Sequence, residues 1–154
     1  LFHTLVSSRL FNVTPDKCHH MDDPAQELTE LLLNLGSVIL RPDRISLIRA
    51  LITESQESED IRRILTTLRA GGKDNILTTW LDRYVHHKQY VVNDISMYSN
   101  MLFGMTIGDL MLQSLACASE TLWVEQNMRP RFQRAVRIFL AGFAQGCNCP
   151  CVPA

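Results

Sequence analysis

Three cysteines near the end of the chain come closest to the residue types and spacing of a chemical site. Cys147, Cys149 and Cys151 alternate with other residues, and their thiolates could offer ligands to a soft metal ion. Structural zinc sites usually hold cysteines in pairs about two to four residues apart, which this alternation does not match. We therefore expect no metal here and interpret residues 147–154 as a disordered tail.

The sequence contains no pattern that is typical of an enzyme. It has no glycine-rich phosphate loop, no nucleophile elbow and no histidine pair at the spacing of zinc proteases. An isolated thiol such as Cys117 is more typical of a small core residue than of a nucleophile. An enzyme built in a helical bundle would need convergent carboxylates such as Glu54, Asp109 and Glu120, whose spacing does not bring them together. We predict a non-enzymatic protein without a cofactor.

Soft and aromatic side chains offer a second kind of site, a pocket for apolar ligands. Methionine adapts its shape, and Trp and Tyr join an apolar body to one polar tip, so such side chains suit this kind of pocket. The same residues at helical spacing are also typical of an ordinary core, and this alternative stays open. The predicted pocket residues are Ile39, Ile48, Ile52, Ile76, Trp80, Tyr84, Met101 and Met105.

Amphipathic helices are the elements that must position these residues. Apolar side chains recur three and four apart over residues 23–40, 43–55 and 59–87, which predicts three helices. The first begins with a capping box at Asp23, followed by proline at the first helical position. Gly71-Gly72 leaves open whether the third is one kinked helix or two.

Two further helices are predicted in the second half of the chain. Residues 93–116 carry apolar side chains in nearly every direction, so one face should meet the domain's own core and another a second chain. Residues 130–144 form the last helix, with Pro130 as its start and Gly142 and Gly146 as stop signals. No alternation at period two appears anywhere, so we predict an all-α fold, a helical bundle of about six helices.

Composition limits the partners that this chain can have by itself. Its 15 Lys and Arg are balanced by 16 Asp and Glu, with a formal net charge of -1, so no broad basic field exists to bind nucleic acid. The 154 residues, 46% of them hydrophobic, can bury one sizeable core. No signal peptide and no run of about 20 apolar residues is present. We expect one cytoplasmic domain over residues 1–146 and no membrane partner.

Three strings carry a family resemblance: RPDRISLIRALITES at residues 41–55, MLFGMTIGDL at residues 101–110 and FQRAVRIFLAGF at residues 132–143. Together they resemble the C-terminal domain of TetR-family transcriptional regulators, particularly the AefR-like branch. The opening LFHTLV resembles the helix that follows the helix-turn-helix in such regulators. This implies that residues 1–11 connect to a DNA-binding domain outside this sequence. One departure is Ser58-Glu59, where the branch usually has Phe-Pro, so the turn there is expected to differ.

The resemblance implies a homodimer that senses a small hydrophobic or aromatic effector. The fourth and last helices would pair with their symmetry mates in a four-helix interface, and effector binding would shift the helix at residues 1–11. DNA would be bound only through the missing domain, most simply by a repressor. The alternative is a helical protein-interaction module with a heterologous partner. The predicted interface residues are Phe103, Gly104, Ile107, Phe132, Ala135, Val136 and Phe139.

Overall fold

The regular elements of the described chain are all helices. The computed structural model describes residues 23–63, 76–117 and 125–146, and no β-strand occurs within these ranges. The all-α prediction is therefore confirmed. The labelled helices are α2 (Pro24–Ile39), α3 (Pro42–Ser55), α5 (Ile76–Lys88), α6 (Ile95–Phe103), the π-helical turn η1 (Gly104–Gly108), α7 (Asp109–Ala116) and α8 (Glu125–Gly146).

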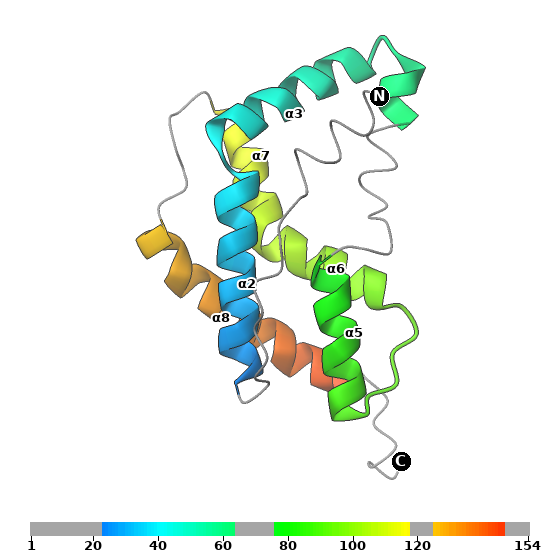
Figure 1. Cartoon of the computed structure of the whole chain (residues 1–154), viewed down its shortest axis with the longest axis vertical. Helices are drawn as coiled ribbons and strands as arrows, with labels where there is room; N and C mark the ends of the chain where they lie inside the picture. The colour runs from blue at the N-terminus through cyan, green and yellow to red at the C-terminus, as the bar shows by residue number, and fades with distance from the viewer. Residues whose placement is uncertain (1–22, 64–75, 118–124, 147–154) are drawn as a thin grey trace.

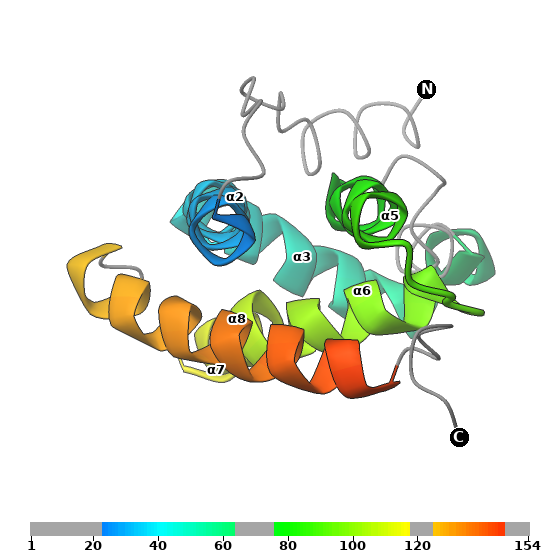
Figure 2. The same cartoon turned by 90° about the horizontal axis from the view of Figure 1, so that it is seen from below.

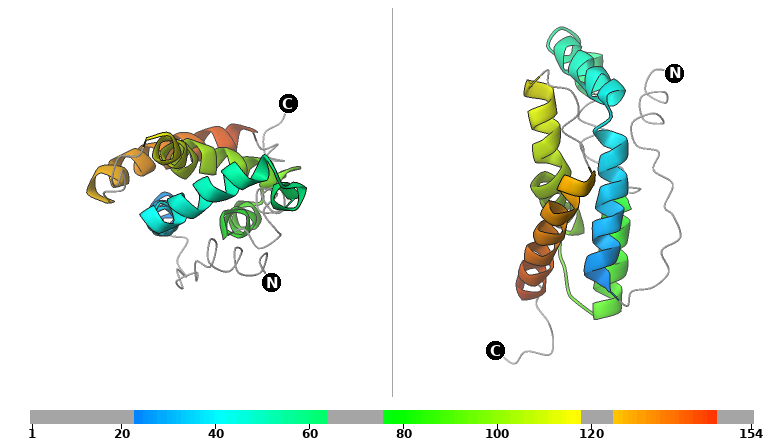
Figure 3. Two further views of the ribbon diagram at one scale, coloured as in Figure 1. Left: turned by 90° about the horizontal axis from the view of Figure 1, so that it is seen from above. Right: turned by 90° about the vertical axis from the view of Figure 1, so that its left-hand side faces the viewer.

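The helices are arranged in two layers. α2 and α5 lie side by side in one layer, and α8 with the continuous helix α6–η1–α7 forms the other (Figures 2 and 3). α3 crosses one end of the bundle over α7 (Figure 1). The core lies between the layers, where α2 packs most extensively against α8. No helix within the described ranges combines the length and the apolar character that crossing a membrane requires.

α2 begins as the sequence predicts. The Asp23 carboxylate accepts hydrogen bonds from the backbone N–H groups of Ala25 and Gln26, both at 3.1 Å, and so satisfies two donors that have no partner within the helix. Pro24 occupies the first helical position, where its missing N–H costs nothing. The local sequence therefore decides where this helix starts.

Replacing Asp23 by alanine is expected to lower the free energy of unfolding by about 1 kcal/mol, because the first turn of α2 loses its cap. Urea unfolding followed by circular dichroism measures the change. Asp23→Asn is the matched control, since its side-chain oxygen can still accept, and it should stay within about 0.5 kcal/mol of the natural chain. Equal losses in the two variants would show that the cap hydrogen bonds are unimportant.

α3 begins at Pro42, and Arg49 in the middle of α3 connects it to α7 by a hydrogen bond. Arg41, at the N-cap, makes no side-chain cap hydrogen bond, but its Nε donates to the Asp43 carboxylate at 3.0 Å. This hydrogen bond lowers the pKa of Asp43 below its ordinary value. Further along, Arg49 Nη2 donates to the carbonyl oxygen of Ser114 at 2.9 Å. A cation is thereby held at the C-terminal end of α7, where the helix dipole favours it.

Two predicted features of the last helix are wrong. α8 begins at Glu125 rather than Pro130, and it continues through Gly142 to Gly146. Proline removes one backbone donor, and glycine only weakens a helix. Neither residue therefore has to end a helix that is stabilised by packing against other helices. Here the packing comes from side chains buried along one side of α8, namely Phe132, Val136, Phe139 and Phe143.

The predicted helix at residues 93–116 is present but contains one wide turn. Asp94 caps it by accepting from the Met97 N–H at 2.9 Å, and residues 104–108 adopt π-helical geometry. A π-turn accommodates one extra residue and shifts the phase of everything beyond it. This phase shift contributes to the spread of apolar side chains around the helix. The buried Thr106 hydroxyl donates to the Leu102 carbonyl at 2.8 Å.

Gly108 closes the wide turn, and alanine there is expected to destabilise the fold. An added Cβ would lie 3.3 Å from the Phe103 carbonyl oxygen and 3.5 Å from its ring. Gly104→Ala is the matched control, because an added Cβ at that position meets no atom within 4 Å. Since alanine favours helix over glycine by about 1 kcal/mol, Gly104→Ala should be neutral or stabilising, and Gly108→Ala should unfold more easily in urea. Identical midpoints would contradict this role of Gly108.

The remaining boundary predictions fall on residues that lie outside the described ranges. They are the connecting helix at residues 1–11, the kink at Gly71-Gly72 and the tail at residues 147–154. Residues 59–63 are helical, as the third predicted helix requires for its beginning.

Candidate functional site

A cluster of aromatic rings joins α5 to the opposite layer. Trp80 and Tyr84 stack with their ring centroids 5.2 Å apart. The ring centroids of Tyr84 and of Phe143 in α8 are 6.2 Å apart. The rings of Tyr98 in α6 and Phe143 pack in a T-shaped arrangement, with their centroids 4.8 Å apart. Ring pairs in these geometries are favourable beyond the area that they bury. The cluster therefore fixes α5, α6 and α8 relative to one another.

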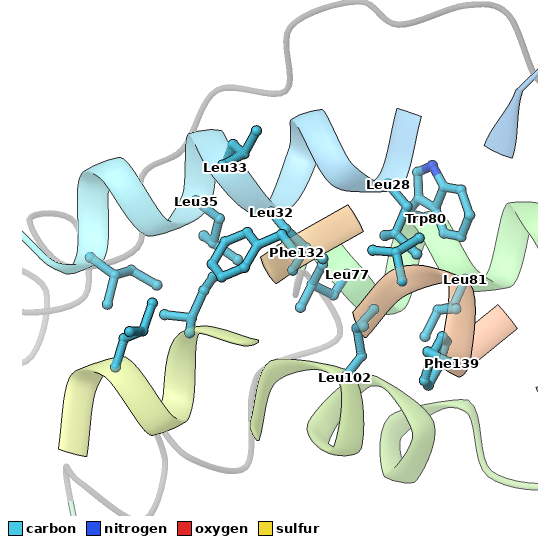
Figure 4. Close-up of a cluster of buried hydrophobic side chains, with 14 of the residues drawn as sticks. Leu28, Leu32, Leu33, Leu35, Leu77, Trp80, Leu81, Leu102, Phe132 and Phe139 are labelled. Carbon is cyan, nitrogen blue, oxygen red and sulfur yellow. The ribbon is translucent and has the colours of Figure 1, made fainter. Parts of the chain in front are cut away.

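The structure brings half of the predicted pocket residues together. Ile39, Trp80 and Tyr84 are buried in the main core, and Ile76 packs against it. Figure 4 shows this core, with Trp80 beside Leu28 of α2. These four residues therefore belong to one apolar region of the chain.

The other predicted pocket residues lie elsewhere. Ile48 belongs to a small separate cluster around Leu51 of α3. Ile52, Met101 and Met105 are all at least 40% exposed. Helical periodicity identified them as apolar positions, but it carries no information about which neighbouring element covers each position.

Three buried polar atoms in the described chain have no hydrogen-bond partner: Glu27 Oε2, Trp80 Nε1 and Ser99 Oγ. Buried polar groups are satisfied in the great majority of cases, so each exception requires an explanation. Sequence reasoning missed Glu27 and Ser99. The signal was present, because Glu27 lies four residues before Leu31 and eight before Leu35, and Ser99 lies three residues before the buried Leu102.

Ion pairs attach α2 to both of its neighbours. Arg83 of α5 donates to Glu27 Oε1 at 2.5 Å, and Arg129 of α8 binds both carboxylate oxygens of Glu30. The Glu27 side chain is only 7% exposed, whereas Arg83 is half exposed. The strength of the Arg83 pair is therefore reduced by solvent screening. Both pairs link α2 to another helix of the bundle.

Most residues of the predicted dimer interface face the inside of their own chain. Ile107, Phe132 and Val136 are fully buried and Phe139 nearly so, and they contribute to the main core between the two layers. Phe103 is partly buried against the same core. Side chains already covered within one chain are not available to a second copy. Of the remaining predicted positions, Ala135 is half-buried and Gly104 is exposed.

The same helices carry a different apolar set on their other side. It is distributed over α6, η1, α7 and α8, which are the helices of one layer (Figure 2). We call this set the outer face. Its members are between 40% and 66% exposed, and they are Met97, Met101, Met105, Leu112 and Ile138.

Ionisable groups of the described chain do not assemble into a reactive centre. No group of His, Cys, Asp and Glu side chains within these ranges could hold a metal ion. Glu54 is exposed on α3, whereas the Asp109 carboxylate binds Arg131 and accepts from Gln113. Glu120 lies outside the described residues.

Comparison with known proteins identifies the family. Residues 26–145 match the profile described as AefR-like transcriptional repressor, C-terminal domain. Among solved structures, a chain from Mesorhizobium loti MAFF303099, described as a TetR-family transcriptional regulator, is similar with a TM-score of 0.63 and 17% identity. The similarity covers 91% of the present chain but 63% of that longer chain. No curated protein sequence matches significantly. Because the family profile covers most of the chain, this chain belongs to the AefR-like C-terminal domains of TetR-type transcriptional regulators.

Proposed function

We propose that this chain senses a small hydrophobic or aromatic effector and dimerises, as the C-terminal part of a transcriptional repressor. DNA is bound through a separate domain, and the chain itself has a formal net charge of -1, which gives it no broad basic surface for phosphates. The outer face is the observation that carries the proposal. It exposes large apolar side chains on neighbouring helices, and such surfaces mark sites of protein association.

A second copy of the chain is the partner that fits the outer face. Two helices from each copy would form a four-helix arrangement with two-fold symmetry, in which the same face meets itself. Gly104 and Gly142 support close approach, because both are exposed and have open space where a side chain would begin. The interface residues proposed here are therefore those of the outer face with Gly104, Ala135 and Gly142.

Effector binding is proposed at the main core of the bundle. Ile39, Ile76, Trp80 and Tyr84 are the pocket residues that share this region, and their apolar and aromatic surface favours a hydrophobic or aromatic molecule. The effector must bind one arrangement of the helices more tightly than the other, because only differential affinity shifts a conformational equilibrium. Repression would then be relieved by a change in the spacing of two DNA-binding domains.

Native mass spectrometry of the purified chain tests both parts of this function. A homodimer that carries additional mass, released on collisional activation, would support dimerisation and effector binding together. A monomer without bound mass would contradict the proposal. It would instead favour an interaction module that uses its outer face for an unrelated helical partner.

A further inference from the structure

We propose that Met97, Met101 and Met105 form a modification site, at which a peroxide oxidises the thioethers to sulfoxides and thereby prevents two copies of the chain from associating. We call these three residues the methionine row. The inference rests on the proposed function, because it requires the outer face to be the contact between copies. It adds a covalent modification that controls this contact.

Spacing places the three thioethers next to one another. Met97 and Met101 belong to α6 and Met105 belongs to η1, and they follow one another at intervals of four residues. Residues four apart are neighbours on the surface of a helix. Their exposed fractions are 47%, 53% and 40%, so each side chain is accessible to a small oxidant in the single chain.

Exposure separates the methionine row from the other methionines of the described chain. Met111 and Met128 are partly buried and pack against the main core. Within the described ranges, every methionine that is at least 40% exposed belongs to the outer face. Because an oxidant must reach the sulfur atom to react, peroxide should modify the contact between copies before it modifies the core.

The reaction transfers one oxygen atom from hydrogen peroxide to the methionine sulfur. The S–O bond forms as the O–O bond breaks, the thioether loses two electrons, and the peroxide is reduced to water. The product is a polar sulfoxide in place of an apolar thioether. Burying such a group in an apolar contact without a hydrogen-bond partner is unfavourable, and in a two-fold symmetric contact each copy contributes its own row.

The oxidant reaches the methionine row while a copy is separate from its partner. Association covers the outer face, but it is an equilibrium, so each copy spends part of its time alone with the row exposed. A copy that is oxidised during this time no longer associates well. Mass action then moves further copies from the dimer to the separate state.

Peptide mass spectrometry after treatment with hydrogen peroxide tests where the chain is oxidised. Thiols are first blocked with N-ethylmaleimide, because Cys117 is exposed and thiolates are also oxidised. The methionine row should react at least about fivefold faster than Met111 and Met128, whose side chains are packed against the core. Equal rates in the two groups would overturn the modification site.

Sedimentation velocity of the chain of residues 1–154, before and after peroxide, measures the effect on association. The dissociation constant of the natural chain should rise at least about 10-fold. A chain with Met97→Leu, Met101→Leu and Met105→Leu has no sulfur in the row, so its own constant should change by less than about threefold on the same treatment. Met111→Leu with Met128→Leu is the matched control and should respond to peroxide as the natural chain does.

The outcomes separate this inference from the proposed function. If the untreated chain is a dimer whose dissociation constant stays the same after the row has been oxidised, the inference is overturned while dimerisation stands. A loss of helical circular dichroism on oxidation, or an equal response of the leucine variant, would also overturn it, because the effect would then arise outside the row. If the untreated chain is a monomer, the dimerisation part of the proposed function is contradicted, and this inference with it.

Discussion

Replacing Ile138 by aspartate is expected to convert the proposed homodimer into a monomer without unfolding it. Ile138 is 60% exposed in the single chain, so the charged side chain remains solvated when the chain is alone. In the dimer, two aspartates related by symmetry would replace apolar side chains at the contact, and removing their charges from water is unfavourable. The dissociation constant should rise by about 100-fold or more, and sedimentation velocity over a range of concentrations measures it.

Gln133→Asp is the control for this result. It introduces the same charge at an exposed position of the same helix that is not part of the outer face, and it should leave the dissociation constant unchanged within a few-fold. A dimer that survives Ile138→Asp would show that the outer face is not the contact between copies. Loss of helical circular dichroism in Ile138→Asp would instead show that this side chain supports the fold.

Truncating Phe132 to alanine is expected to cost the fold about 3–5 kcal/mol, because the ring is fully buried between the layers and its removal leaves a cavity. Figure 4 shows Phe132 pointing toward Leu32 and Leu35 of α2. A loss of this size is a large fraction of the stability of an ordinary domain. Urea unfolding measures it, extrapolated to zero denaturant and compared at one protein concentration.

Val91→Ala is the control for Phe132, since Val91 is 56% exposed and its truncation should change the unfolding free energy by less than about 0.5 kcal/mol. Together, the Phe132 and Ile138 variants assign the two sides of α8. A buried core residue affects unfolding, whereas an interface residue affects association. A Phe132→Ala chain that unfolds like the natural one but no longer dimerises would reverse the assignment.

Fold class and the starts of two helices, α2 and α6, could be read from the sequence because they depend on residues that are close together along the chain. Asp23 and Asp94 cap the helices that follow them, and each does so through side-chain hydrogen bonds to backbone groups within three residues. Apolar periodicity of three and four likewise acts over one helical turn. The family resemblance in three strings was also correct, as the match over residues 26–145 shows.

The wide turn at Gly104–Gly108 could not be read in this way. A regular helix and a π-turn differ by one residue in one turn, and the pattern of apolar residues around Met105 is compatible with both. In the folded chain, Thr106 and Ile107 are fully buried, and η1 contacts α2 and α8. Packing against other helices determines which geometry this segment adopts.

The sequence by itself determined an all-α chain with several amphipathic helices, their approximate limits and their family. Only the tertiary structure decided which side of α8 is internal: Phe132 and Val136 fill the core, whereas Ile138 is exposed. It also decided that Trp80 is buried while Met101 is exposed, although both fit the same apolar pattern. The physical reason is that the spacing of apolar residues shows only which residues share a face of one helix, whereas burial depends on neighbouring helices that are distant in sequence.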